Sequence, residues 1–232
     1  MSGSPVTVAV DAMGGDGGVA VNVEGGVSAA RELGVRVLLV GRKDDLERSL
    51  AAHAAPGLAV EIRHASEVVE MDESPSTALR RKKHSSIRVA LDLVRRGEAG
   101  AFVSAGNTGA VMASALVVLG PLAGVERPAI AVVLPGLTGP LVLLDAGANV
   151  DCKPRHLLQF AIMGHTYCRD ILGIPAPRVG LLSIGAEESK GSELTKEAFK
   201  AIEEEPGLRF IGNVEGRDVF AGTADVIVCD GF

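Results

Sequence analysis

Short runs of valine, isoleucine and leucine alternate with segments of helical periodicity along most of this 232-residue chain, and no other feature constrains its fold as much. Parallel sheets have this texture, because their strands are buried on both faces and are joined by helical crossovers. The pattern therefore predicts an α/β fold. The expected strands span residues 6–11, 35–41, 58–65, 100–106, 178–185, 208–216 and 224–230, and the expected helices end near Leu33 or span 44–52, 74–96 (one broken helix or two), 109–119, 154–172 and 192–204.

The middle of the chain interrupts this order. Residues 128–135 and 140–147 have the composition of two strands, and the Gly-Leu-Thr-Gly sequence between them predicts a tight turn. We therefore expect one three-layer α/β/α domain over residues 1–232, with a mostly parallel sheet and an antiparallel hairpin. The chain stops two residues after its last predicted strand, and no helix follows to cover that strand. This arrangement leads us to expect that a C-terminal segment is missing.

Charge and composition argue against several classes of function. The net charge of −6 and the isoelectric point near 5.4 disfavour a nucleic-acid-binding surface over the whole molecule. The three cysteines are widely spaced and the five histidines lack metal-ligand spacing, so neither a disulfide framework nor a metal site is expected. The N-terminus has no basic region and no long apolar run, which argues against a secretory signal and favours the cytoplasm.

Loops of glycine and polar residues follow most of the predicted strands. In open α/β sheets, ligands bind in the loops at the carboxyl ends of the strands. One such loop carries little information, but a repeated mixture of glycine with Ser, Asn, Asp or Lys predicts a shared polar site on one rim of the sheet. The loops are residues 11–18, 104–110, 145–151, 183–191, 212–218 and 229–232.

The loop at residues 104–110, Ser-Ala-Gly-Asn-Thr-Gly-Ala, has the character of an anion site. A predicted strand leads directly into it, and a helix follows. Free N–H groups at a helix N-terminus, glycines that allow close approach and hydroxyl groups together bind anions. A helix capped by Asn107 or Thr108 explains the same residues without a ligand, and both interpretations stay open.

Lys190 lies in a glycine- and serine-rich loop just before a predicted helix. A lysine at a helix start opposes the helix macrodipole. A solvated surface lysine is the ordinary interpretation. Its position between Ser189 and Gly191 also fits a contact with an anion.

The first glycine loop resembles a dinucleotide fingerprint only loosely. Asp16 would place a negative charge beside a pyrophosphate, and the second predicted strand ends in Gly41-Arg42 without an acid to hold a ribose hydroxyl. A tight glycine turn with a helix cap explains this loop better. The sequence therefore argues against a nicotinamide-dependent dehydrogenase and makes a nucleotide at this loop the less favoured of the two interpretations.

A basic stretch occupies residues 80–96. It contains seven lysines and arginines against the single acid Asp92, a formal charge of 7 − 1 = +6. Such a run is usually a solvated helix face. It also fits a surface that steers an acidic protein partner or phosphate-bearing groups.

Taken together, the loops and the basic stretch resemble one family, the bacterial phosphate acyltransferases of phospholipid synthesis (acyl-acyl-carrier-protein:phosphate acyltransferases). The resemblance runs from Val8 to Phe232, and His84 and Ser192 depart from the usual family pattern. The motifs that carry it are DAMGGD (11–16), SPSTALRRKK (74–83), SSIRVAL (85–91), SAGNTGA (104–110), LLDAGANVD (143–151), Lys190-Gly191, GNVEGRD (212–218) and DVIVCDGF (225–232).

The resemblance implies transfer of a fatty acyl group from acyl carrier protein to inorganic phosphate, which gives acyl phosphate. It also implies a fold like those of phosphotransacetylases and of isocitrate and isopropylmalate dehydrogenases. A homodimer that associates peripherally with the inner face of the cytoplasmic membrane and uses no cofactor is the expected form of the protein.

Because phosphate is the nucleophile in this reaction, the protein needs no serine or cysteine intermediate. It must hold phosphate against a thioester and stabilise the oxyanion that forms. The residues expected to act are Lys190, Asn107, Asp145 and Asn213 in catalysis, Ser104, Gly106, Asn107, Thr108 and Gly109 in phosphate binding, Asp11, Gly14, Gly15, Asp16, Asn149, Asp151 and Glu215 at the rim, and Arg80, Arg81, Lys82 and Lys83 in docking of the carrier protein.

Two other functions are compatible with these residues. A phosphotransacetylase that uses acyl-coenzyme A would have a similar phosphate loop and a similar fold. A non-catalytic α/β scaffold in this shortened form is the second. The choice of acyl donor separates the first from the acyl-carrier-protein enzyme, and product formation separates the second.

Overall fold

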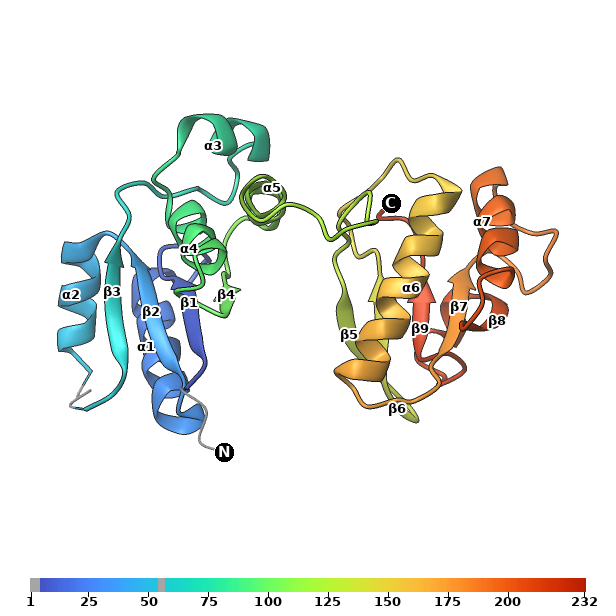
Figure 1. Ribbon diagram of the computed structural model, residues 1–232, viewed down its shortest axis with the longest axis horizontal. Coiled ribbons are helices and arrows are strands. Elements are labelled where there is room, and N and C mark those ends of the chain that lie inside the picture. The colour runs from blue at the N-terminus through green and yellow to red at the C-terminus, as the bar shows by residue number, and fades with distance from the viewer. Residues whose placement is uncertain (1–4, 54–56) are drawn as a thin grey trace. The chain divides into compact units, whose positions relative to one another are not determined.

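The chain forms two compact units, Met1–Pro121 and Leu122–Phe232, and each has its own sheet (Figure 1). The structure is a computed structural model and describes residues 5–53 and 57–232. The single domain expected from the sequence stays a prediction, and each unit is described here by itself.

The N-terminal unit contains a four-stranded, fully parallel sheet with the strand order β3-β2-β1-β4. This order places the carboxyl ends of β1 and β4 side by side, because the two strands are hydrogen-bonded neighbours. The elements are β1 (Thr7–Asp11), α1 (Gly18–Leu33), β2 (Arg36–Gly41), α2 (Lys43–Ala51), β3 (Val60–His64), α3 (Pro75–Arg81), α4 (Ser86–Arg95), β4 (Ala101–Val103) and α5 (Thr108–Val118).

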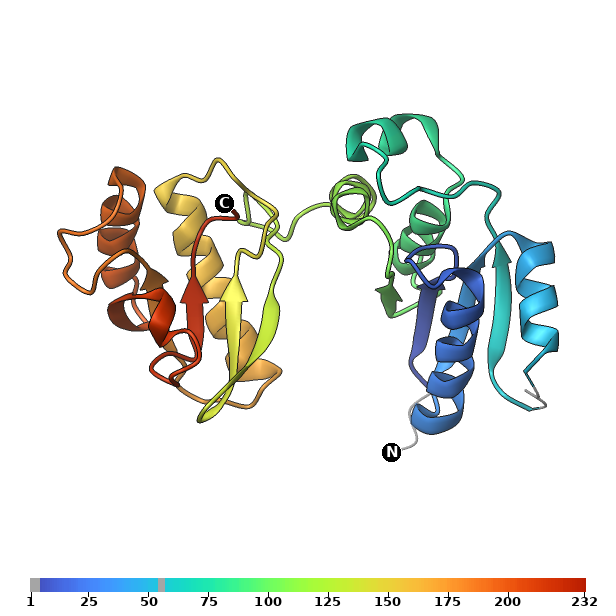
Figure 2. The same ribbon diagram turned by 180° about the vertical axis from the view of Figure 1, so that it is seen from behind.

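Helices cover both faces of this sheet. Successive residues of a strand point to opposite faces, so the apolar run of β2 contributes to two cores. Leu38 and Val40 pack in one core with residues of α4, whereas Val37 and Leu39 pack in another with residues of α1 and α2. Figure 2, seen from behind, brings α1 to the front and leaves α4 at the back. The predicted three layers are confirmed for this unit.

Residues 74–96, predicted as one broken helix or two, form two helices, α3 and α4. Pro75 occupies the first turn of α3, where its missing N–H removes no hydrogen bond. Ser85 caps α4, and its side chain accepts a hydrogen bond from the backbone N–H of Arg88 at 3.3 Å.

The C-terminal unit contains a five-stranded sheet with the order β5-β6-β9-β7-β8. The first pair is antiparallel and the other pairs are parallel, so the predicted hairpin is confirmed. The elements are β5 (Val132–Gly136), β6 (Gly139–Leu144), α6 (Pro154–Asp170), β7 (Arg178–Leu182), α7 (Glu193–Glu203), β8 (Arg209–Val214), the 3-10 helix η1 (Gly216–Asp218) and β9 (Val226–Val228).

The helices α6 and α7 cover one face of the second sheet, where Phe160 and Ile202 pack against its strands. On the opposite face, Val219 and Ala224 from the connection around η1 pack against Ile227. Within the described part of this unit, no α-helix forms a third layer. The connection between β8 and β9 spans only residues 215–225, which is too short for a long crossover helix.

No helix in the described ranges combines the length and the apolar character needed to cross a bilayer.

Candidate active site

Asp11 and Ser104 join the loops that follow β1 and β4 in the N-terminal unit. The Ser104 hydroxyl donates to Asp11 Oδ2 at 2.8 Å and accepts from the backbone N–H of Gly106 at 3.0 Å. The other carboxylate oxygen of Asp11 accepts from the N–H of Met13 at 3.1 Å. Asp11 is only 1% exposed, so it holds the two loops together from inside.

Glycines allow these two loops to approach backbone to backbone. A Cβ atom on Gly14 would lie 2.6 Å from Asp11 Oδ2 and 2.8 Å from Gly106 Cα. Gly15 has a positive φ of 86°, and a Cβ atom there would lie 2.9 Å from Ala105 Cβ. Asp16, also expected at the rim, is exposed beside this contact.

Asn107 is the N-cap of α5, and both ends of its side-chain amide are engaged. Its Oδ1 accepts from the N–H of Ala110 at 2.9 Å. Its Nδ2 lies within hydrogen-bond distance of the carbonyl oxygens of Met71 and Glu73, at 3.0 and 2.9 Å, and of Glu70 at 3.3 Å. The capping interpretation is therefore confirmed, and the amide ties the segment before α3 to the start of α5.

Fewer groups at the start of α5 are free for an anion than the sequence predicts. Thr108 is exposed, and no described residue accepts from the backbone N–H of Thr108 or Gly109. Gly109 packs closely on α3, since a Cβ atom there would lie 2.7 Å from Pro75 Cγ. Phosphate binding at this loop stays a prediction. The groups left to bind it are the Thr108 hydroxyl and the backbone N–H groups of Thr108 and Gly109.

The basic stretch divides into paired and unpaired charges. The Lys82 ammonium pairs with the Glu73 carboxylate and donates to the carbonyl of Val68 at 2.6 Å. The hydrogen bond from Lys82 lowers the pKa of Glu73 below its ordinary value. Lys82 therefore supports the fold rather than an open docking surface.

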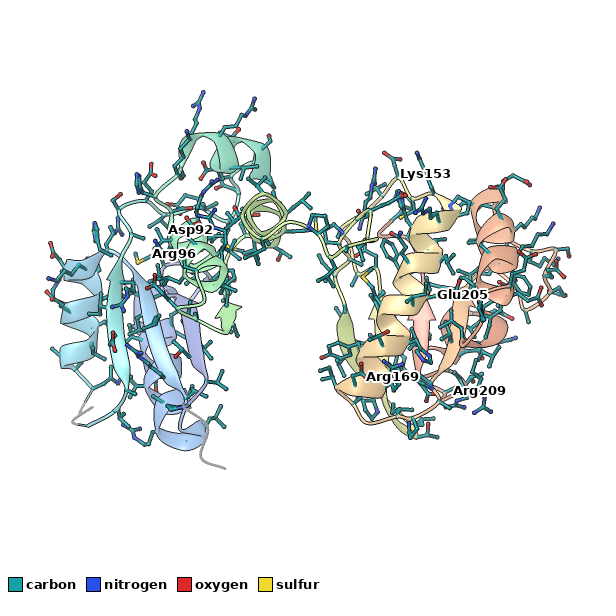
Figure 3. The ribbon with its side chains drawn as sticks, in the orientation of Figure 1. Asp92, Arg96, Lys153, Arg169, Glu205 and Arg209 are labelled. Atoms are coloured by element: carbon teal, nitrogen blue, oxygen red, sulfur yellow. The ribbon has the colours of Figure 1, made fainter. Side chains whose placement is uncertain are left out.

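The arginines at the end of α4 are also paired. Arg95 contacts Asp92 at 2.8 Å, and Arg96 contacts Glu98 at 3.0 Å (Figure 3 labels Asp92 and Arg96). By contrast, three exposed cations at the end of α3 form no salt bridge within the described ranges. They are Arg80, Arg81 and Lys83.

Asp145, at the carboxyl end of β6, organises its own loop. Oδ1 accepts from the N–H of Ile130 at 2.8 Å, and Oδ2 accepts from the backbone N–H and the side-chain amide of Asn149 at 2.6 and 2.9 Å. Oδ2 also accepts from the N–H of Ala148 at 3.1 Å. Asp145 is 2% exposed, and Asp151 at the end of the loop is exposed.

A second loop of this unit, residues 183–191, carries Lys190. The Lys190 side chain is exposed, and its ammonium has no acceptor in the described part of the chain. Its backbone N–H donates to the carbonyl of Glu187 at 3.0 Å. The same carbonyl accepts from Nδ2 of Asn213, at the end of β8, at 2.9 Å.

Glu215, also expected at the rim, belongs to the cap of η1. Its backbone N–H donates to Asp218 at 2.9 Å, and its carboxylate accepts from Arg217 at 2.8 Å. Its charge is therefore shared with a neighbour on the surface.

The cysteines are poor nucleophiles in their surroundings. Burial raises the pKa of Cys168 and of Cys229 to about 11. Burial also raises the pKa of Cys152. The thiolate is the reactive form of cysteine, and these three thiols stay protonated near neutral pH.

A sequence profile of the family described as "Fatty acid synthesis protein" matches residues 6–232 of the chain. The chain belongs to this family.

Two curated relatives with high sequence identity to this chain are both named phosphate acyltransferase. The chain is 56% identical to a phosphate acyltransferase of Trichlorobacter lovleyi and 57% identical to one of Geobacter sulfurreducens, each over 225 residues. Each match covers 97% of this chain and 65% of the relative. The chain thus spans about two thirds of the length of the family members that it matches.

Among solved structures, the EutD phosphotransacetylase from Staphylococcus aureus has a similar fold. The TM-score is 0.67 at 18% sequence identity, and the match covers 98% of this chain and 78% of the other. At this identity the likeness concerns the fold, and it agrees with the predicted phosphotransacetylase-like architecture.

Each of the two units contains its own set of residues from the family motifs. Asp11, Gly14, Ser104, Gly106 and Asn107 come together in the N-terminal unit. In the C-terminal unit the loops that carry Asp145, Lys190 and Glu215 follow the carboxyl ends of parallel strands at one edge of the sheet. A common pocket for Asn107 and Lys190 stays a prediction.

Sequence reasoning missed Ser183, whose buried Oγ has no partner in the described residues, and Asn22, whose amide donates to the Gly14 carbonyl at 2.7 Å. Ser183 lies in a predicted rim loop, so its position was a usable signal. Asn22 lies inside a helical pattern, and nothing in that pattern marks its contact.

Proposed function

We propose that the protein transfers a fatty acyl group from acyl carrier protein to inorganic phosphate and so supplies acyl phosphate for phospholipid synthesis. One observation carries the proposal: the family match over residues 6–232, with relatives at 56–57% identity that are named phosphate acyltransferase. The polar loops at the strand ends, with a free lysine and free N–H groups, support it.

In the proposed reaction a phosphate oxygen attacks the carbonyl carbon of the thioester. The new C–O bond forms, the C–S bond breaks, and the sulfur of the carrier leaves with the electron pair. The proton that phosphate loses balances the one that converts this thiolate to the thiol. No acyl-enzyme intermediate is needed, which agrees with cysteines whose raised pKa values keep them protonated.

The residues divide into two roles in this proposal. Lys190 neutralises phosphate or the oxyanion that develops on the thioester carbonyl, since its ammonium is exposed and unpaired in the described structure. The Thr108 hydroxyl and the N–H groups of Thr108 and Gly109 donate to phosphate. The engaged groups of Asp11, Ser104, Asn107 and Asp145 hold the loops in shape.

The partners follow from the same reaction. The unpaired cations Arg80, Arg81 and Lys83 are suited to an acidic carrier protein. We also propose that the protein is a cytoplasmic homodimer that associates peripherally with the membrane and uses no cofactor. These four properties rest on the family resemblance.

A phosphotransacylase that uses acyl-coenzyme A is the second candidate. The fold likeness to the staphylococcal phosphotransacetylase favours it, because the two chains share their architecture over 98% of this one. The two candidates differ only in the carrier of the acyl group.

The experiment compares the two donors directly. The protein is mixed with [³²P]phosphate and either palmitoyl-acyl-carrier protein or palmitoyl-coenzyme A, and labelled acyl phosphate is measured. The relative from Geobacter sulfurreducens is assayed in parallel to establish that the conditions support turnover. Faster product formation from the carrier protein supports the proposal, and faster formation from coenzyme A supports the second candidate. No product from either donor, with an active relative, favours the non-catalytic scaffold.

A further inference from the structure

A β-bulge in β8 determines which way Asn213 faces. Val179 of β7 pairs with Phe210, but Leu181 pairs with Asn213, so β8 contains one extra residue between these pairs. Gly212 lies in this interval with a positive φ of 88°. Paired residues share a face, and Leu181 packs beneath α6 and α7. Without the extra residue, Asn213 would face the opposite side of the sheet.

From this position the Asn213 side chain holds the turn that presents Lys190. Asn213 is 8% exposed, and its Nδ2 donates to the Glu187 carbonyl at 2.9 Å. The backbone N–H of Lys190 donates to the same carbonyl at 3.0 Å. One buried amide on a neighbouring strand therefore fixes the carbonyl that closes the turn.

Glycines allow the backbone on both sides of Lys190 to pack closely against its neighbours. A Cβ atom on Gly185 would lie 3.0 Å from Lys190 Cγ, so the stem of the lysine rests on the loop backbone. Gly191 has a positive φ of 97°, and a Cβ atom there would collide with Thr195 Oγ1. The ammonium thus extends from a turn that is constrained at both ends.

The amide of Asn213 is only half satisfied. Its Oδ1 is buried and has no hydrogen-bond partner within the described residues, and the same holds for Oγ of Ser183, the residue that follows β7. A buried acceptor without a partner destabilises a fold. The donor side of the amide, by contrast, has a definite partner in the Lys190 turn, the Glu187 carbonyl at 2.9 Å.

We infer that Asn213 is a positioning residue, which acts on the reaction through Lys190 rather than by touching substrate. The inference rests on the proposed function, because it assigns Lys190 the role of meeting phosphate or the oxyanion. It replaces the direct catalytic role that the sequence predicted for Asn213.

A double-mutant cycle tests this coupling. Asn213→Asp keeps the shape of the side chain and removes the N–H donor. In the Lys190 background we expect it to lower kcat/KM for phosphate about tenfold, because a catalytic group that is displaced loses its contribution. In the Lys190→Ala background we expect a change of less than about twofold. An equal loss in both backgrounds overturns the inference.

The matched control is Gln159→Glu, another amide that donates to a loop carbonyl, that of Gly124 at 2.8 Å. It carries the same chemical change far along the chain from the Lys190 turn, and kcat/KM is expected to stay within about twofold of wild type. A tenfold loss in this control would show that any such substitution lowers activity, which would also overturn the inference.

Amide hydrogen exchange tests the positioning without any activity. In Asn213→Asp the N–H of Lys190 is expected to exchange about tenfold faster than in the wild-type protein, because its acceptor carbonyl is released. Asn213→Ala replaces this variant if the buried carboxylate prevents folding. Unchanged exchange overturns the inference. If the wild-type protein forms no acyl phosphate, the proposed function fails, and the exchange result still decides whether Asn213 holds the turn.

Discussion

The Asn107 loop of the N-terminal unit and the Lys190 loop of the C-terminal unit use their polar groups in opposite ways. Both amide ends of Asn107 are engaged. In the other loop the Lys190 ammonium has no acceptor among the described residues, and Asn213, which contacts this loop from β8, has a buried Oδ1 without a partner there. Both loops mix glycine with polar residues, yet the Asn107 side chain is fully engaged within the protein and the Lys190 side chain is not. In the Asn107 loop, the Thr108 hydroxyl and the backbone N–H groups of Thr108 and Gly109 are the groups left without a partner among the described residues. Residue type therefore identifies a polar loop, whereas the hydrogen bonds in the structure distinguish residues that stabilise the loop from residues that remain available to bind a ligand.

The largest effect on stability is expected at Asp145, which resembles Asn107 in that both ends of its side chain are engaged. Replacement by alanine leaves four buried or partly buried donors without an acceptor. The free energy of unfolding is expected to fall by about 3 kcal/mol or more, measured by urea denaturation. Asp151→Ala, at the exposed end of the same loop, should change it by less than about 0.5 kcal/mol. A loss below about 1 kcal/mol at Asp145 would mean that this loop is not held by its carboxylate.

A smaller loss of stability is expected at Asn107. Asn107→Ala removes the cap of α5 and the contacts with the carbonyls before α3, and it should lower the free energy of unfolding by about 1–2 kcal/mol. Asn107→Ser keeps a neutral oxygen that can cap the helix but removes the Nδ2 donor, so its loss should be smaller. Equal losses in the two variants would contradict the assignment of separate roles to the two ends of this amide.

Much of the fold is predictable because it depends on local patterns. The apolar run at Leu38–Val40 gives a buried strand, and Gly136–Gly139 gives the turn of the hairpin. The sequence also places glycine and polar loops at the strand ends, which is where the structure has them.

The use of individual side chains was not predictable, because it depends on distant partners and on register. Asp11 and Ser104 meet across 93 residues of sequence. The inserted residue at Gly212 turns Asn213 to the other face of the sheet, and a period-two pattern does not reveal such a shift. Lys82 was grouped with its basic neighbours, although its ammonium is paired with Glu73.

Activity and stability measured together in Lys190→Ala test the role of Lys190 most directly, and Lys200→Ala, at an exposed lysine on α7, is the control. We expect Lys190→Ala to lower kcat/KM for acyl phosphate formation by about 10²-fold. We expect the free energy of unfolding of this variant to stay within about 0.5 kcal/mol of wild type. If Lys190→Ala still forms acyl phosphate with an activity within about twofold of wild type, the Lys190 ammonium does not act on the substrate.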